Sequence, residues 1–139
     1  MHIKPLADAE TRSISIAAPP ATVLDLLSDP RRLPDWAPAF ASTVEQDGHD
    51  WFIGSAGAQL RIRVQVSLDH GTVDLLRPED PSRGARMRVL HNEHGSEFVF
   101  TLIFPVGIEK DVIARQMTTV ESELRTVRDL CEARTSSVP

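Results

Sequence analysis

The last third of the chain carries one continuous helical stripe. Its apolar residues alternate at spacings of four and three: Ile113, Met117, Val120, Leu124, Val127 and Cys131. This spacing places them on one face of an α-helix, which we expect over residues 109–133. A helix of about 25 residues is roughly 37 Å long. In a chain of 139 residues, a helix of that length is needed only if a sheet wraps around it.

The residues before this helix follow the two-residue period of β-strands. The clearest case is residues 59–69, where Leu60, Ile62, Val64, Val66 and Leu68 share one face, which we expect to be buried. Similar patterns predict strands over 12–18, 40–46, 51–56, 72–77, 85–92 and 96–104, and residues 78–84, with two prolines and a glycine, predict a loop.

Two short helices are predicted between the first two strands. Residues 19–29 present Val23, Leu24 and Leu27 on one helical face, and the step from Asp29 to Pro30 ends that helix. The following prolines leave room for only one further short turn of helix, which carries Trp36.

This order of elements predicts an α+β fold with the arrangement β-α-α-β6-α. Consecutive strands with short connections pair antiparallel, so we expect a seven-stranded antiparallel sheet wrapped around the long C-terminal helix. The domain is expected to span residues 11–134, after a flexible lead-in (1–10) and before a disordered tail (135–139).

Composition narrows the possible functions. The net charge of −5 and the absence of a basic cluster argue against nucleic acid as a partner. No apolar run is long enough to span a membrane and no signal peptide is visible, so a cytoplasmic protein is expected. One cysteine excludes an intrachain disulfide, and the five histidines do not form a recognisable zinc pattern. No nucleotide fingerprint is present, and we predict no cofactor and no metal.

Three segments together resemble a known family. They are SISIAAPPATVLDLLSDPRRLPDWAP (13–38), GSEFVFTLIFP (95–105) and QMTTVESELRTVRDLCE (116–132). In this order and spacing they resemble the START/Bet v 1-like (SRPBCC) superfamily, in its small bacterial branch of polyketide cyclase/dehydrase-type proteins. The resemblance covers residues 12–133 and implies a helix-grip fold with a cavity between the sheet and the last helix.

The resemblance implies a hydrophobic small molecule as the partner. The expected function is that of a polyketide cyclase, aromatase or dehydratase. Alternatives are a carrier or sensor for a lipid, quinone or aromatic metabolite without chemistry, and a protein-interaction module. The chain is expected to be a monomer or a homodimer. The absence of tyrosine puts the usual cavity side chains of such cyclases in doubt, so no catalytic set is carried over.

Two residues are candidates for a functional role because of their side-chain chemistry. His91 shares a strand face with Met87 and Val89, so we expect it either to point inward as a general acid or base, or to lie near the strand end, partly hydrated and hydrogen-bonded to the backbone. Trp36 is expected either to stack on a ligand at the cavity mouth or to serve as a hydrophobic plug. The complete set of predicted ligand-binding residues is Trp36, Phe40, Val64, Val89, Phe100, Gln116 and Met117.

Two further patterns are assigned no site. The sequence HNEH (91–94) lacks the helical spacing of a zinc motif, so no metal is predicted there. Four arginines that could form a cationic stripe are expected on the solvated face of the sheet, namely Arg61, Arg63, Arg86 and Arg88.

Overall fold

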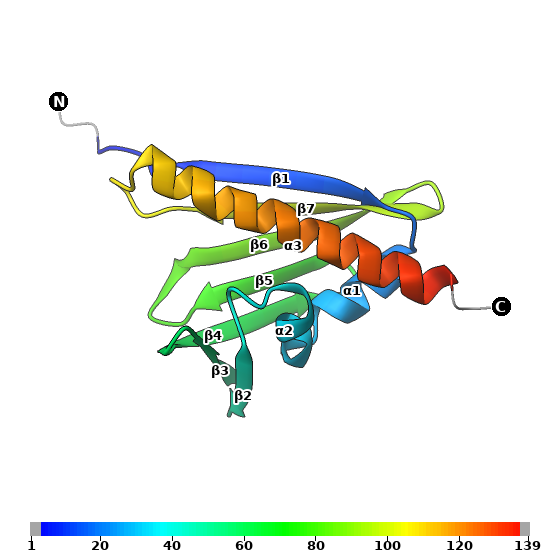
Figure 1. The fold of residues 1–139 in the computed structure, drawn as a ribbon, viewed down its shortest axis with the longest axis horizontal. Helices are drawn as coiled ribbons and strands as arrows, with labels where there is room; N and C mark the ends of the chain where they lie inside the picture. Colours follow the sequence, from blue (N-terminus) through cyan, green and yellow to red (C-terminus); the bar gives the residue numbers. More distant parts are fainter. Residues whose placement is uncertain (1–3, 137–139) are drawn as a thin grey trace.

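The computed structural model describes residues 4–136 and has one sheet, two short α-helices and one long helix (Figure 1). The elements in chain order are β1 (Ala9–Ile16), α1 (Pro20–Leu27), the 3-10 helix η1 (Pro30–Arg32), α2 (Leu33–Trp36), β2 (Thr43–Asp47), β3 (Asp50–Ser55), β4 (Ala58–Ser67), β5 (Thr72–Arg77), β6 (Asp80–Asn92), β7 (Gly95–Ile103) and α3 (Lys110–Ser136).

The sheet has seven strands in the order β1-β7-β6-β5-β4-β3-β2. Every neighbouring pair is antiparallel, as the short connections predicted. Only β1 and β7 depart from strict succession, because β1 returns to pair with the last strand. The predicted fold class and helix-grip arrangement are therefore confirmed.

Three boundaries differ from the predictions. β1 begins at Ala9, inside the expected lead-in, and α3 continues to Ser136, inside the expected tail. Residues 137–139 of that tail lie outside the described part of the chain. The loop expected over 78–84 is mostly strand, because β6 begins at Asp80. Pairing shifts from Leu76 with Gly84 to Arg77 with Asp80, so the intervening residues form a bulge that accommodates Pro81.

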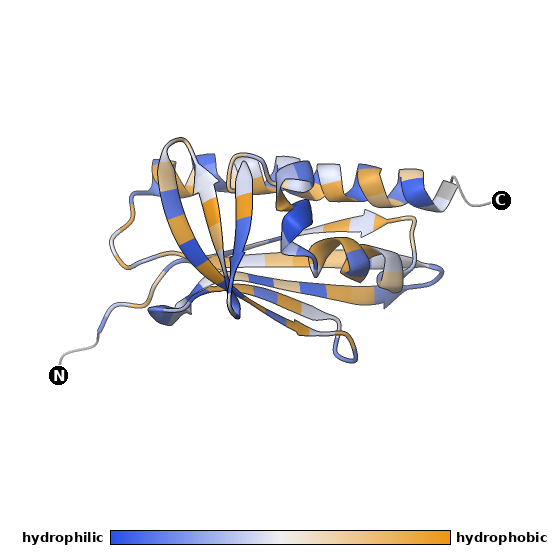
Figure 2. Cartoon of the chain, turned by 90° about the horizontal axis from the view of Figure 1, so that it is seen from below, coloured by the Kyte–Doolittle hydropathy of each residue, from blue (hydrophilic) through white to orange (hydrophobic). Residues whose placement is uncertain are grey.

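The predicted stripe of α3 forms the centre of the core. Its residues Ile113, Met117, Val120, Leu124, Val127 and Cys131 are each at most 6% exposed. They belong to the same buried cluster as Val73, Met87 and Phe98 of the sheet. In Figure 2 hydrophobic and hydrophilic residues alternate along the strands, and α3 runs along one side of the sheet with the short helices between.

Local sequence explains the two short helices. Pro20 occupies the first turn of α1, where its missing N–H leaves no hydrogen bond unmade. The side chain of Asp29 accepts a hydrogen bond from the Arg31 N–H at 3.0 Å and so caps η1. Both α1 and α2 contact α3, and α1 also contacts β5, β6 and β7. The short helices therefore occupy part of the space between α3 and the sheet.

The burial predicted for β4 holds only for part of the strand. Ile62 is 1% exposed, whereas Val66 is 42% and Leu68 is 64% exposed. β3 pairs with β4 only from Ala58 to Ile62, so Val66 lies at an open edge of the sheet, and Leu68 lies in the turn after β4. The expectation that Val66 and Leu68 are buried is therefore wrong.

The outer face carries the predicted arginines in ion pairs. Arg61 contacts Asp47 at 2.7 Å, and Arg63 contacts Asp50 at 2.9 Å. The hydrogen bonds from Arg63, and secondarily Arg61, hold the pKa of Asp50 below its usual value. Arg86 contacts Asp74 at 3.0 Å, which assigns Asp74 to the outer face. The remaining member of the group, Arg88, is exposed, so the solvated-face interpretation is confirmed.

Candidate functional site

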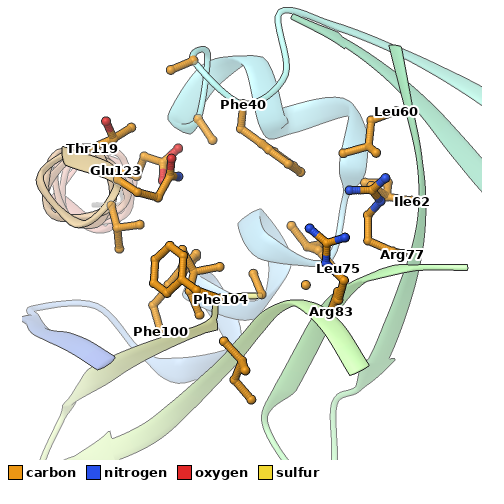
Figure 3. A pocket seen from close by; sticks show the side chains of 18 of the residues that line it. Phe40, Leu60, Ile62, Leu75, Arg77, Arg83, Phe100, Phe104, Thr119 and Glu123 are labelled. Carbon is orange, nitrogen blue, oxygen red and sulfur yellow. The ribbon is translucent and has the colours of Figure 1, made fainter. Parts of the chain in front are cut away.

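A cavity of about 530 Å³ lies between the sheet, α2 and the N-terminal half of α3 (Figure 3). The sheet contributes apolar side chains from three strands: Leu60, Ile62, Leu75, Phe100 and Leu102. Phe40 reaches it from the segment after α2, and Phe104 reaches it from the segment after β7. The walls are therefore mainly apolar, as expected for a pocket that takes a small hydrophobic molecule.

The cavity is closed at one end and open at the other. Residues of the closed part, such as Trp36, Ile62 and Val120, are at most 2% exposed. Ile103 at 43% and Val112 at 41% exposure mark the open part. This mouth lies at the end of the sheet that carries the β5–β6 turn and the connection from β7 to α3 (Figure 1).

Four of the predicted ligand-binding residues line the cavity: Trp36, Phe40, Phe100 and Gln116. Val64, Val89 and Met117 do not. Val89 and Met117 are 6% and 1% exposed and pack within the core, where side chains fill the space that they were predicted to border. Val64 packs against that core from the sheet edge.

Of the two interpretations of His91, the inward-pointing acid or base is wrong, and the position near the strand end is confirmed. His91 is exposed and lies near the turn to β7. Gly84 and Ala85, which do line the cavity, lie toward the opposite end of the same strand. Strand parity identifies the side on which His91 lies, but the elements that cover that side do not reach the strand end. His91 therefore has no geometric basis as the proton carrier of this cavity.

The structure places Trp36 as a hydrophobic plug and not at the cavity mouth. Its side chain is 2% exposed and belongs to the core cluster, as a plug would. It also lines the closed part of the cavity. The indole N–H is buried, and within residues 4–136 no group accepts a hydrogen bond from it.

Glu123 is the polar residue that the sequence analysis missed. It lies on α3, lines the cavity and is 8% exposed (Figure 3). Among the described residues no side chain pairs with its carboxylate, and burial raises its pKa to about 7. The signal was present in the sequence: Val112, Gln116, Thr119 and Glu123 follow spacings of four, three and four, which form a second stripe beside the apolar one.

Two arginines complete the polar groups of the cavity. Arg77 ends β5, and Arg83 lies in the bulge of β6. Figure 3 draws both on the wall opposite Glu123. Arg77 contacts Glu79 at 2.7 Å through one terminal nitrogen, but its Nε is buried without an acceptor in the described part of the chain. These three residues are the ionisable groups in the cavity wall.

Other kinds of site find no support in residues 4–136. No group of three or more histidine, cysteine, aspartate or glutamate side chains in this range is arranged to hold a metal ion. No helix in the same range has both the length and the apolar character needed to cross a membrane.

One known family matches most of the chain. The family described as "Polyketide cyclase / dehydrase and lipid transport" matches residues 10–132. No curated protein matches the sequence.

Several solved structures are similar in fold. XoxI from Bacillus cereus has a TM-score of 0.73 at 17% identity, covering 88% of this chain and 94% of its own. The Aha1 dimer from Colwellia psychrerythraea gives 0.71 at 17% identity, with 90% and 96% covered. Ara h 8.0201 gives 0.62 at 10% identity, with 91% and 99% covered. At these identities the likeness establishes the fold alone.

Proposed function

We propose that this chain, which belongs to the polyketide cyclase/dehydrase and lipid transport family of the SRPBCC superfamily, binds a hydrophobic small molecule in the cavity and acts on it as a cyclase- or dehydratase-type enzyme. The observation that carries the binding proposal is the cavity of about 530 Å³ with apolar walls. Its volume lies within the range of roughly 300–1,000 Å³ that is typical of small-molecule sites.

The catalytic part of the proposal rests on Glu123. A carboxyl group without partners in an apolar cavity is neutral and ionised in similar amounts near pH 7, because burial raises its pKa to about 7. It can therefore both accept and return a proton. In an aldol cyclisation, Glu123 would take the proton from a carbon between two carbonyl groups, and that carbon would attack a distant carbonyl. The protonated Glu123 would then return the proton to the new alkoxide oxygen.

The shape of the cavity would supply the rest of the catalysis. A flexible chain confined between Phe40, Phe100 and Phe104 adopts fewer conformations than it does in water. Confinement in a reactive conformation lowers the entropic part of the barrier to ring closure.

A non-catalytic carrier is the second candidate. It is favoured by the small number of polar side chains among the lining residues: Arg77, Arg83, Gln116, Thr119 and Glu123. Carriers hold their ligands mainly by apolar contact and need few polar groups. The two candidates differ in whether Glu123 is required for turnover or only for affinity.

Binding is tested by filling the cavity. Ala85 lines it from β6, so A85F would place a phenyl ring in the space that a ligand needs. The probe is 4-(1-pyrenyl)butanol, a neutral fluorescent molecule, titrated into the protein. We expect A85F to weaken binding at least about tenfold. The matched control A133F adds the same ring at an exposed position of α3 and should bind as wild type does. Equal affinity of A85F and wild type contradicts the proposal.

Catalysis is tested with a linear poly-β-ketone thioester of N-acetylcysteamine as substrate. E123Q keeps the size of the side chain and removes the proton carrier. We expect the rate of ring formation, followed by chromatography of the products, to fall about a hundredfold or more. E123Q that cyclises as fast as wild type, or wild type without activity over the uncatalysed rate, would favour the carrier.

A further inference from the structure

We propose that Arg77 and Arg83 bind the anionic group of an amphipathic ligand whose apolar body occupies the cavity. The chemical class is a hydrophobic molecule with a carboxylate or phosphate at one end. This inference rests on the proposed small-molecule binding and adds the charge and the orientation of the ligand.

The fold brings the two arginines together at the cavity. They flank the turn between β5 and β6, where pairing shifts from Leu76 with Gly84 to Arg77 with Asp80. Gly84 has φ +138°, and a Cβ at this position would overlap the carbonyl oxygen of Leu75. The bulge therefore depends on glycine, and it fixes where Arg83 leaves the strand.

Arg77 has N–H donors that make no hydrogen bond with another described residue. Arg77 Nε is buried without an acceptor within residues 4–136, and Arg77 lines the cavity. The guanidinium group of Arg77 carries five N–H donors and contacts Glu79 through one terminal nitrogen, so a ligand that supplies acceptor oxygens would be favoured at its accessible donors. Anionic oxygens are stronger acceptors than neutral ones, and the planar guanidinium group matches a carboxylate or phosphate.

The charged residues around the cavity also favour an anionic ligand. Arg61, Arg63 and Arg86 on the outer face all form ion pairs. Arg83, in contrast, has no ion pair with another described residue. The neighbouring acid Asp80 accepts hydrogen bonds from the backbone and hydroxyl of Ser82. These bonds, with smaller contributions from the charges of Arg83 and Arg77, hold the pKa of Asp80 below its usual value. Two cationic side chains, Arg77 and Arg83, therefore line an apolar cavity in a protein whose net charge is −5.

Exposure fixes the orientation of the ligand. Arg83 is exposed and the Arg77 side chain is 32% exposed, so an anion between them would remain partly hydrated. The apolar body would extend past Leu75 and Phe100 into the closed part. Glu123 lies on the opposite wall, so the anion would be held away from its carboxylate (Figure 3).

A matched pair of probes tests the inference. 4-(1-Pyrenyl)butyrate and 4-(1-pyrenyl)butanol share one apolar body and differ in the charge at its end. In wild type we expect the butyrate to bind at least about tenfold more tightly than the butanol at low salt. In the double variant R77Q/R83Q the butyrate should fall to the affinity of the butanol, while the affinity for the butanol stays unchanged.

Two controls accompany the titrations. R88Q removes an exposed arginine of β6 that does not line the cavity, so it should leave the preference for butyrate intact. The single variant R83Q changes an exposed residue without an ion pair and should retain the wild-type melting temperature. It should still lose part of the preference for butyrate.

Equal binding of the two probes by wild type would overturn the inference and leave the proposed function standing. A preference for butyrate that survives in R77Q/R83Q would also overturn it. Failure of both probes to bind wild type would overturn the proposed function itself, and the inference with it.

Discussion

The surroundings of Glu123 change its acid–base properties. The sequence of α3 contains five acids, and the other four are less buried than Glu123. Glu123 is 8% exposed, since it follows Val120 by three residues and precedes Val127 by four. Burial of a carboxylate without a cation or donor beside it favours the protonated form and raises the pKa to about 7. Position on the helix, rather than residue type, distinguishes it from the other acids.

This pKa has a consequence for stability. Unfolding returns Glu123 from a pKa of about 7 to its ordinary value of 4.5. The folded state therefore binds more protons between these values, and stability falls as pH rises through this window. From pH 5 to pH 8, wild type should lose about 2–3 kcal/mol of its free energy of unfolding relative to E123Q. Urea denaturation at both pH values measures the difference.

The variant E123L provides the control for this prediction. It also lacks a titrating group, so its stability should follow the same pH dependence as that of E123Q even if the two differ in absolute stability. A constant difference between wild type and E123Q from pH 5 to pH 8 would contradict the burial of an ionisable carboxyl at this position.

Among the elements, the β5–β6 hairpin differs most from its sequence prediction. Two prolines and a glycine within seven residues predict a loop, and local sequence carries no signal for pairing across a bulge. The pairing depends on Leu76 and Arg77, which meet their partners only once the sheet forms. Arg77 and Arg83 therefore could not be recognised as neighbours at one cavity from the sequence.

The bulge makes a prediction at Gly84. G84A would force a Cβ against the Leu75 carbonyl at a positive φ, so we expect a loss of at least about 2 kcal/mol in urea denaturation. Displacement of Arg83 should also weaken pyrenylbutyrate binding more than pyrenylbutanol binding. The control G48A introduces alanine at φ +61° in open space and should cost only about 1 kcal/mol. Equal losses in the two variants would contradict the close packing at the bulge.

Periodic elements were predicted well for a physical reason. The apolar stripe of α3 repeats its signal over six positions, and burial along the whole helix preserves it. The same logic failed for His91, since strand parity gives the side of the sheet but not the extent of the elements covering it. Cys131 was correctly expected to pack in the core, where burial raises the pKa of its thiol to about 11.

On the scale of the whole molecule, α3 packs along the concave face of the sheet, and the cavity between them opens at one end. Leu124 is 2% exposed on the side of α3 that faces the core, so L124A should cost about 2–5 kcal/mol in the free energy of unfolding. Val112 is 41% exposed near the cavity mouth, and V112A should change stability by less than about 0.5 kcal/mol. Chemical denaturation compares the two. Similar losses of unfolding free energy in the two variants would show that the packing of α3 against the sheet does not depend on its buried apolar residues.

The residues that pack the core and the residues that line the cavity lie in different halves of the sheet. The half of the sheet near the β6–β7 turn is filled by α1 and α3, and the other half keeps a cavity under α2 and the first turns of α3. The central claim is that this second half receives a hydrophobic molecule.

The most direct test is a titration of isotopically labelled protein with 4-(1-pyrenyl)butanol, followed by amide resonances in nuclear magnetic resonance spectra. The account predicts shifts concentrated at residues that line the cavity from different elements, such as Phe40, Leu75, Phe100 and Val120. It also predicts that these shifts disappear in A85F. Shifts confined to the outer face of the sheet, at residues such as Arg63 and Arg88, or no shifts at all, would contradict it.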